Sequence, residues 1–579
     1  MVRPIRPKNL FHRIVVTGTT YTILLSKFPL FSNSFTVVPF LQRIPTEPNN
    51  VILPQQQQGS GSLLLAGVRG GSSIASSTSI NSTQRTNSAA RSLFLNPHNL
   101  KQQQQQQQQQ QSDVFRSSSS QLNMSTQNET NNNNNSSSIN VSISDAFDGG
   151  NGKFMKLVET HDDDDITTVY INIKKDPFTQ LEQCHHFQYF SFRSSVRDSS
   201  SNEPIKIKYV IANAGKASYS KAWVDSTTFV SDTPSDPLSW NRKLDTSYDE
   251  STGELSWTHE HTTDAPSAYF AYFPPFSYER HLDLVSKCSK SPMATVHSLG
   301  QTLDGREMEC ITIGTGSKKC WIIHRQHPGE TMAEYYAEGL LSRLLGLDSG
   351  YAVDGKVQDV LKLYTFYIVP NMCPDGAFRG HLRTNANGQN LNREWCSSGS
   401  KEEGTFYEAP TLERSPEVYH VLNKMDETGV DVFLDVHGDE ELPYNFLAGS
   451  EGCPNWSPRL QALHGAFLSA YQNTNSDMQI PIGYEPENPG EGRMNVCSNQ
   501  IAYRFDCLGA TLEMPFKDCW SNPDPIRGWN PARSRMLGAS VLEPLSYIAP
   551  YLREDGEFWK DAFGKEEEYM RPTSNYRSL

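Results

Sequence analysis

The chain has 579 residues, a hydrophobic fraction of 36% and a formal net charge of −14 at pH 7. This length exceeds a typical single domain, so we expect one large globular unit and a further region of another kind. The negative charge argues against nonspecific nucleic-acid binding, because contacts to phosphates require clustered Lys and Arg.

Residues 1–150 are predicted to be a disordered, low-complexity leader. They contain the glutamine run 102–111, the asparagine run 131–135 and many serines, with few aromatic or branched apolar residues after position 50. Such a segment cannot bury enough apolar surface to offset the entropy of ordering the chain. From about Lys153 onward the chain is rich enough in large apolar residues to form cores.

The start of the chain is basic and poor in acid, since Glu47 is the only acidic residue before position 113. This bias is typical of a mitochondrial or plastid transit peptide, and a disordered tail without a targeting function is the alternative. The apolar stretch 14–25 is too short and too polar to span a bilayer, while a weak secretory signal stays open. We therefore expect no membrane span.

The ten cysteines show no disulfide framework and no paired zinc motif. They all lie between Cys184 and Cys519, at irregular spacings. A reducing compartment is the simpler interpretation. The predicted location is the cytoplasm, and a mitochondrion or plastid is the alternative that the basic, acid-poor leader indicates.

An antiparallel β-sandwich domain is predicted for residues 151–285. Short segments of alternating polarity are separated there by Asp, Ser, Asn, Gly and Pro, which is typical of strands joined by turns. The segments are TTVYINI (167–173), FQYFSF (187–192), IKIKYVIA (205–212), ELSWTHEH (254–261) and AYFAYF (268–273).

A doubly wound α/β domain with a mixed sheet flanked by helices is predicted for residues 286–555, with a tail at 556–579. Apolar strands alternate here with long amphipathic helices. The expected strands are 320–326, 364–371, 430–438 and 510–516, and the expected helices are 331–347, 415–428, 458–473 and 531–551. Ligands bind outside the carboxyl ends of such strands, so polar residues at these ends are candidate site residues.

Three side chains at strand exits predict a zinc site. His327 and Glu330 lie three residues apart in a Pro-Gly turn after one strand, and His437 follows the strand VDVFLDV. Two imidazoles and a carboxylate suit zinc, and three protein ligands leave a fourth position for water. His324 is an alternative to His327. Taken alone, the first pair would fit an ordinary turn and His437 an ordinary core histidine. Because metal-capable residues follow two predicted parallel strands, a metal site is favoured.

Two further acidic features fit a catalytic role. Asp435 shares a strand face with His437 and could orient its imidazole, and Asp439 in the following loop is the alternative. Glu513 is a lone carboxylate in the apolar strand ATLEMPF. Because an unpaired buried carboxylate is costly, we expect Glu513 to act as a general base, with a solvent-facing edge position as the alternative.

The loop 371–395 is rich in glycine, asparagine and arginine. Arg379, Arg383 and Arg393 are its arginines, and a planar guanidinium can hold a carboxylate with two hydrogen bonds. The loop is therefore a candidate ligand-binding segment, with a solvated surface loop as the alternative.

Four motifs in order resemble the M14 zinc metallocarboxypeptidases, and specifically their cytosolic carboxypeptidase-like branch. The motifs are FPPFSYER (273–280), HPGE (327–330), the loop PDG…GHLR…NLNREW (374–395) and FLDVHGDE (433–440). The resemblance covers roughly residues 153–552. It implies a mixed eight-stranded sheet flanked by helices, with a β-sandwich in front.

The resemblance also implies a role for each matched residue. One zinc ion would be held by His327, Glu330 and His437, with Glu513 as the general base. Arg383 would polarise the scissile carbonyl, and Asn392 with Arg393 would hold the C-terminal carboxylate of the substrate.

Two features of the family have no clear counterpart in this sequence. The tyrosine that caps the substrate could be Tyr503 or Tyr484. The basic specificity residue of the members that remove glutamate could be Arg504 or Arg493.

The predicted function is zinc-dependent removal of C-terminal residues from peptides or proteins. Glutamate on polyglutamylated proteins, such as tubulin-like tails, is one candidate substrate. The alternatives are a zinc deacylase of amino-acid conjugates and a carboxypeptidase fold that binds peptides without cleaving them. None of the ligands or the base is missing from the sequence, which favours an active enzyme.

Overall fold

The computed structural model describes residues 139–159, 166–177, 185–198, 202–396, 408–554 and 556–563, and the backbone of four short strands elsewhere. The chain divides into the units Met1–Leu95 and Asn96–Leu579. In the first unit the described strands are β1 (Arg13–Val16) and β2 (Thr19–Thr22), which form an antiparallel pair. The glutamine and asparagine runs lie outside the described residues.

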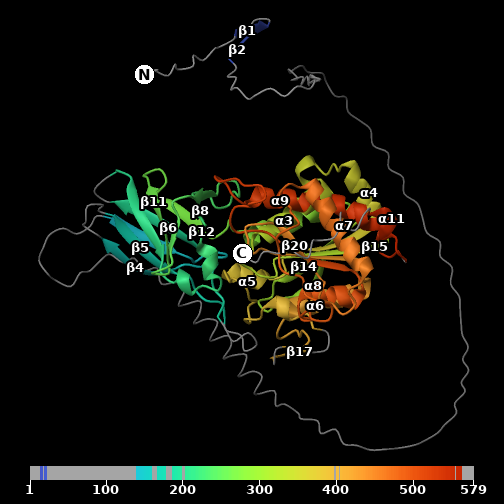
Figure 1. Ribbon diagram of the computed structural model, residues 1–579. Coiled ribbons are helices and arrows are strands. Elements are labelled where there is room, and N and C mark those ends of the chain that lie inside the picture. The colour runs from blue at the N-terminus through green and yellow to red at the C-terminus, as the bar shows by residue number, and fades with distance from the viewer. Residues whose placement is uncertain are drawn as a thin grey trace, which may run out of the picture. The chain divides into compact units, whose positions relative to one another are not determined.

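Two five-stranded sheets form the predicted β-sandwich (Figure 1). The first sheet has the order β10-β11-β7-β5-β4 and the second β3-β6-β12-β8-β9. The bounds are β3 Ile139–Ser144, β4 Lys153–Glu159, β5 Thr167–Asn172, β6 Ser191–Asp198, β7 Ile205–Ile211, β8 Thr228–Ser231, β9 Asn241–Lys243, β10 Ser247–Asp249, β11 Glu254–His261 and β12 Ser267–Ala271.

The sandwich differs from the prediction at two points. Strand β3 pairs with β6, so the domain begins before the predicted boundary at residue 151. Strands β5 and β7 pair in parallel, whereas the other described pairs of the sandwich are antiparallel. The intervening β6 belongs to the opposite sheet, and the chain that returns from it runs alongside β5 in the same direction.

Alternating aromatic residues fill the space between the two sheets. Trp257 of β11 stacks on Phe190 with the ring centroids 5.9 Å apart, and Tyr209 of β7 lies 4.7 Å from Phe270 of β12. All four side chains are buried. Aromatic pairs at this spacing stabilise a core beyond the area that they bury.

A mixed sheet of seven described strands, rather than the eight that the resemblance implied, forms the α/β domain. Its order is β13-β14-β16-β15-β19-β21-β20. Strands β16, β15, β19 and β21 are parallel, and the others pair antiparallel at the two edges. The bounds are β13 Ala294–Gln301, β14 Glu307–Ile313, β15 Lys318–His324, β16 Tyr364–Val369, β19 Val432–Val436, β20 Phe446–Gly449 and β21 Leu508–Glu513. A separate short hairpin pairs β17 (Ser400–Glu402) with β18 (Thr405–Tyr407).

Helices cover both faces of the central strands, as the nearly continuous apolar runs of β15 and β19 require. Ile322 and Leu434 pack into one core with α3, α4, α7, α9 and α10, whereas Trp321 and Phe433 pack into another with α6 and α8. The helix bounds are α2 Tyr278–Ser289, α3 Met332–Leu345, α4 Gly355–Leu363, α5 Pro374–Arg379, α6 Pro416–Thr428, α7 Pro458–Thr474, α8 Cys497–Phe505, α9 Pro531–Ser540, α10 Leu542–Ile548 and α11 Trp559–Ala562.

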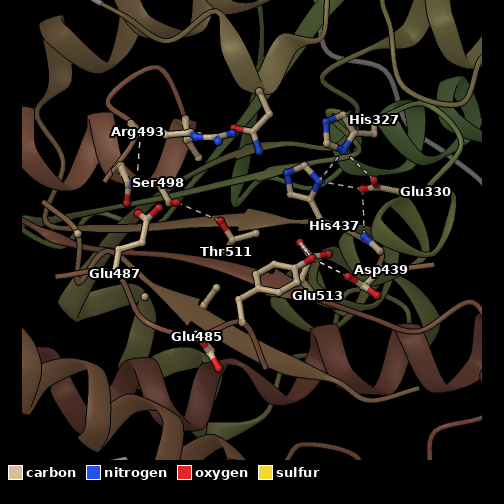
Figure 2. A pocket seen from close by; sticks show the side chains of 18 of the residues that line it. His327, Glu330, His437, Asp439, Glu485, Glu487, Arg493, Ser498, Thr511 and Glu513 are labelled. Atoms are coloured by element: carbon tan, nitrogen blue, oxygen red, sulfur yellow. Dashed lines mark hydrogen bonds and ion pairs between the residues drawn. The ribbon is translucent and has the colours of Figure 1, made fainter. Parts of the chain in front are cut away.

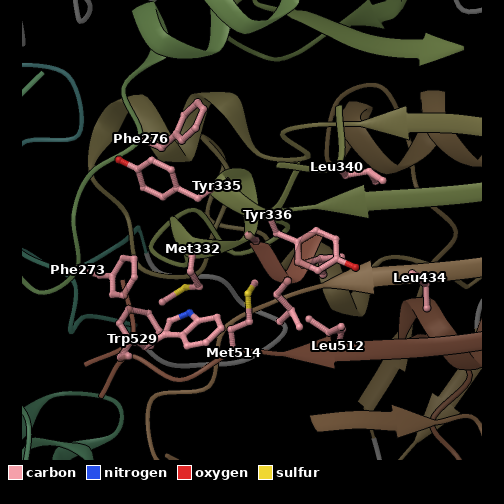
Figure 3. Close-up of a cluster of buried hydrophobic side chains, with 14 of the residues drawn as sticks. Phe273, Phe276, Met332, Tyr335, Tyr336, Leu340, Leu434, Leu512, Met514 and Trp529 are labelled. Carbon is pink, nitrogen blue, oxygen red and sulfur yellow. The ribbon is translucent and has the colours of Figure 1, made fainter. Parts of the chain in front are cut away.

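The first core joins the sheet to the residues that connect the two domains. Figure 3 shows Phe273 and Phe276 of this connection in the same cluster as Met332 and Tyr335 of α3 and Trp529. Among the described helices, none is both long and apolar enough to cross a bilayer.

The predicted helix 531–551 is interrupted. Helix α9 ends at Ser540 and α10 begins at Leu542. Pro544 lies in the first turn of α10, where its nitrogen has no hydrogen to donate to the carbonyl four residues earlier. A proline is tolerated at the start of a new helix, so the chain restarts there.

Candidate active site

Three metal-capable side chains converge at the carboxyl ends of the neighbouring parallel strands β15 and β19 (Figure 2). His327 and Glu330 lie in the turn between β15 and α3, and His437 directly follows β19. The Nδ1 atoms of the two imidazoles are 3.2 Å apart. The Glu330 carboxylate lies 2.7 Å from Nδ1 of His327 and 2.8 Å from Nδ1 of His437. Ligands in a tetrahedron around zinc are separated by about 3.3 Å, so one ligand atom from each of the three side chains fits a single ion.

The second nitrogen of each imidazole is held by an oxygen acceptor. Nε2 of His327 lies 3.0 Å from Oδ1 of Asn390, and Nε2 of His437 lies 2.9 Å from Oδ2 of Asp435. A ring that donates from Nε2 presents the lone pair of Nδ1 to a metal. The donor set and both tautomers therefore suit zinc.

Electrostatics keeps two of the three ligands in their metal-binding form. Burial and the positive charge of Arg383 lower the pKa of His327 to about 3. Burial raises the pKa of Glu330, but the nearby imidazoles of His327 and His437 outweigh it and hold this pKa below its usual range. For His437, burial is outweighed by Asp435 and Glu330, which raise its pKa well above the ordinary value.

Glu513, the last residue of β21, lies in the same cleft. It is 7% exposed, and burial together with the charge of Glu330 raises its pKa well above the usual range, against the influence of His437. The hydroxyl of Tyr484 lies 3.4 Å from Oε1, whereas Oε2 is buried without a hydrogen-bond partner among the described residues. Such a carboxylate can take a proton from water near neutral pH.

The predicted substrate-binding loop brings its residues to the cleft. Nη1 of Arg383 lies 3.4 Å from Nδ1 of His327. Oδ1 of Asn392 accepts from the backbone N–H of Cys497 at 2.9 Å, which leaves the amide donors of Asn392 for a ligand. Arg393 donates to the backbone carbonyl of Asn392 at 2.7 Å.

These residues line one cavity of about 460 Å³, a volume typical of a small-molecule or peptide-end site. The structure brings together all seven predicted site residues: His327, Glu330, Arg383, Asn392, Arg393, His437 and Glu513. Away from the metal ligands, Figure 2 shows Glu487, Arg493, Ser498 and Thr511 gathered at another part of the cleft, here called the distal end.

Comparison with known proteins agrees with this geometry. Residues 143–273 match the family model "Cytosolic carboxypeptidase N-terminal domain", and residues 279–534 match "Zinc carboxypeptidase". A putative carboxypeptidase A from Shewanella denitrificans is 42% identical, with a TM-score of 0.61 over 70% of this chain and 98% of that one. A metallo-carboxypeptidase from Pseudomonas aeruginosa is 35% identical, with a TM-score of 0.61 over 71% of this chain and all of that one.

The chain belongs to the M14 zinc carboxypeptidases. It is a carboxypeptidase hydrolase, and the predicted fold class, a mixed sheet flanked by helices behind an N-terminal domain of strands, is confirmed. An uncharacterized protein of Zymomonas mobilis is 39% identical over 72% of this chain and 99% of its own length. Cytosolic carboxypeptidase-like protein 5 of Bos taurus is 27% identical, but the chain spans only 30% of that protein.

The structure decides between the alternative metal ligands, and between the alternative partners of His437, in this carboxypeptidase. Nδ1 of His324 lies 2.9 Å from the carbonyl of Val369, and this imidazole lies outside the metal-capable group. Asp435, rather than Asp439, contacts His437. Asp439 instead accepts from the Tyr484 hydroxyl at 2.6 Å.

The alternatives for the capping tyrosine and for the specificity residue differ in whether they line the cleft. Tyr484 and Arg493 line the cleft of the carboxypeptidase. Tyr503 and Arg504 lie on α8 outside it, and Arg504 pairs with Asp426. Arg379 also lies outside the cleft and pairs with Asp304 at 2.6 Å. Tyr484 is therefore the better candidate for a substrate-capping tyrosine, and Arg493 for a specificity residue.

Sequence reasoning missed one cleft residue that comes from the sandwich. Tyr219 lines the cleft, and its backbone N–H and C=O both bond to the side chain of the buried Gln188, at 2.8 and 3.1 Å. No local motif marks Tyr219. Only the tertiary contact between the two domains places it beside Arg383. The charge of Arg383 lowers the pKa of Tyr219, but burial and the nearby carboxylates outweigh it and raise this pKa above its ordinary value.

Proposed function

We propose that this carboxypeptidase removes single residues with charged side chains from the C-termini of peptides or proteins, using one zinc ion held by His327, Glu330 and His437. The composition of the distal end carries this proposal. It presents Glu487, Arg493, Ser498 and Thr511 instead of an apolar wall. A charged side chain can be paired there, whereas an apolar one would strip these groups of water without compensation.

The roles of the other residues follow from their positions. Bound zinc would polarise the scissile carbonyl and lower the pKa of a coordinated water to about 7. Asn392 and Arg393 hold the terminal carboxylate, which places the last peptide bond beside Arg383. Arg383 stabilises the negative charge that develops on the carbonyl oxygen. Glu513 takes the proton from the attacking water and returns it to the leaving amine.

Glutamate is the first candidate for the removed residue. Arg493 can pair with its side-chain carboxylate by two hydrogen bonds. An acidic tail, as on a polyglutamylated protein, would be repelled at long range by the net charge of −14. The arginines Arg383, Arg393 and Arg493 supply the local positive charge that such a tail requires.

A C-terminal arginine or lysine is the second candidate, because Glu451 and Glu487 also line the cleft. The ligand named in the Pseudomonas structure, (2-guanidinoethylmercapto)succinic acid, combines a guanidine group with two carboxylates. A comparable pairing of charges in this chain would place a cationic side chain against Glu451 and Glu487.

Peptides that differ only in their last residue test the proposal. We expect the highest kcat/KM for a charged last residue, and a preference for an apolar residue would contradict the proposal. If glutamate is preferred, Arg493→Gln should reduce kcat/KM for that peptide about 10-fold or more, since a charged hydrogen bond is lost. The matched control is Arg504→Gln, whose side chain pairs with Asp426 outside the cleft.

The same assays address the other two readings of the sequence. A deacylase would cleave acylated amino acids faster than any peptide of the panel. A binding module without activity would retain peptides and cleave none of them, even with zinc bound.

We also propose that the enzyme acts in the cytoplasm, because several relatives bear the name cytosolic carboxypeptidase. The leader on which the organelle alternative depends lies largely outside the described residues. A fusion of residues 1–60 to a fluorescent reporter distinguishes the two: a diffuse cytoplasmic signal agrees with the proposal, and import into an organelle contradicts it.

A further inference from the structure

One buried carboxylate of the β-sandwich contacts the loop that carries Arg383. Asp176, in the segment after β5, is 2% exposed. Its Oδ1 accepts the backbone N–H of Leu382 at 2.8 Å. Its Oδ2 accepts the N–H of Arg383 at 2.8 Å, the N–H of Thr384 at 3.0 Å and the Thr384 hydroxyl at 3.2 Å.

This contact holds three consecutive amides of the loop in one arrangement. Successive N–H groups that point to one place form a concave anion site, and an ionised carboxylate offers about four acceptor positions to fill it. Four donors also compensate the burial of the charge, which would be costly if it were left unpaired. An amide in place of the carboxylate would direct N–H donors at N–H donors.

Asp176 and the loop are each fixed from a second side. The N–H of Asp176 donates to the carbonyl of His186 at 2.7 Å. On the far side of the loop, the carbonyl of Leu382 accepts the N–H of Gly329 at 2.9 Å, and Gly329 belongs to the turn that carries His327 and Glu330. The loop is therefore held between the sandwich and the metal-binding turn.

We propose that Asp176 is a positioning residue for Arg383, so that the sandwich domain forms part of the active site. The guanidinium of Arg383 reaches the cleft from a backbone whose amides Asp176 fixes, and it lies 3.4 Å from His327. Asp176 does not line the cleft and acts only through the loop. This inference rests on the proposed role of Arg383 in stabilising charge on the substrate.

The variant Asp176→Asn of the full chain tests the proposal without a change in side-chain size. We expect kcat on the best peptide of the panel to fall about 10- to 100-fold, the loss that follows a small misplacement of a catalytic group. KM and zinc content should change little, because Arg383 acts mainly in the transition state. Loss of zinc, or a rise in KM with an unchanged kcat, would overturn the proposal.

A matched control separates this effect from a general weakening of the domain contact. Asp148 is another sandwich carboxylate that accepts a backbone N–H, that of Tyr278 at the start of α2, and neither residue lines the cleft. Asp148→Asn should lower stability with kcat unchanged. If Asp148→Asn reduces kcat as much as Asp176→Asn does, a specific role for Asp176 is excluded.

The double variant Asp176→Asn, Arg383→Ala shows whether the effect passes through Arg383. In the Arg383→Ala background, Asp176→Asn should change kcat less than twofold, because the side chain to be positioned is gone. An undiminished effect would contradict the proposal.

Hydrogen exchange gives a readout that does not depend on activity. Amides in a peptide that spans residues 381–385 should be protected in the wild type and exchange at least 10-fold faster in Asp176→Asn. Equal exchange in both proteins would overturn the proposal. A wild-type protein that cleaves no peptide of the panel but has protected amides would instead refute the proposed function. The contact between Asp176 and the loop would still stand.

Discussion

At the scale of single residues, we expect Glu513 to be required for chemistry and not for metal binding. Glu513→Gln keeps the shape of the side chain but cannot accept a proton, so kcat should fall by roughly 10²- to 10⁴-fold. Zinc content should stay at one ion per chain, because Glu513 is not among the three ligands. Peptide turnover and metal analysis on the same sample check both statements.

A matched control for this variant is Glu427→Gln, which changes an exposed glutamate that pairs with Lys424 on α6. It should leave kcat and zinc content unaltered. Wild-type turnover in Glu513→Gln would remove the assignment of the base.

The contact between Asp435 and His437 predicts an effect on metal affinity. Asp435→Asn removes the carboxylate that accepts the Nε2 proton at 2.9 Å and so orients the imidazole. The affinity for zinc should decrease about 10- to 100-fold. Competition with a chelator measures this, and an unchanged affinity would mean that the ring is oriented by other contacts.

At the scale of the elements, periodicity predicts the central strands and the long helices, because their burial is set by local pattern. The expected ranges 331–347, 415–428 and 458–473 correspond to α3, α6 and α7 within two residues at each end. The expected helix 531–551 fails because sequence periodicity continues through the break between Ser540 and Leu542. The parallel pairing of β5 with β7 depends on the route of the chain between two sheets, which no local pattern records.

The same distinction applies to the candidate site. His327, Glu330, His437 and Glu513 could be predicted because each lies at the end of a strand with a clear pattern or in the turn directly after one. Asp176 could not, since the three residues that donate its four hydrogen bonds are more than 200 residues away in sequence.

One contact between elements predicts how stability depends on pH. His281 of α2 lies 2.7 Å from Glu334 of α3 and 3.1 Å from Glu309 of β14. Burial lowers its pKa, but the two carboxylates outweigh burial and raise it to about 9. The folded state therefore binds this proton more tightly than the unfolded state, whose histidine has a pKa of about 6.5.

The stabilisation by His281 should be complete below pH 6.5 and should be lost as the pH rises through 9. A difference of this size corresponds to roughly 3 kcal/mol. Urea denaturation at pH 6.5 and pH 9.5 measures it, and His281→Gln should remove most of the dependence. His297→Gln, at an exposed position, is the control. Equal pH dependence in His281→Gln and the wild type would contradict the assignment.

At the scale of the whole described unit, the sandwich and the α/β domain are joined by polar and aromatic contacts. Asp176 holds the loop of Arg383, and Arg242 of β9 donates to four backbone carbonyls beyond β21: those of Phe516, Lys517, Arg527 and Trp529. Tyr272 stacks on Phe516 with the ring centroids 4.5 Å apart. The two domains should therefore unfold as one cooperative unit.

Arg242→Met tests this cooperativity, because it leaves buried carbonyls without donors. We expect the free energy of unfolding to decrease by about 3 kcal/mol or more. Calorimetry should show a single transition in the wild type, at a lower temperature in the variant. Two separate transitions in the wild type would show that the domains are independent.

The central claim is that His327, Glu330 and His437 bind one catalytic zinc ion. Anomalous diffraction at the zinc absorption edge, from crystals of the metal-loaded enzyme, tests it most directly. We expect one strong peak in the cleft, within bonding distance of Nδ1 of each imidazole and of the Glu330 carboxylate. A zinc peak elsewhere, or none between these three side chains, would contradict it.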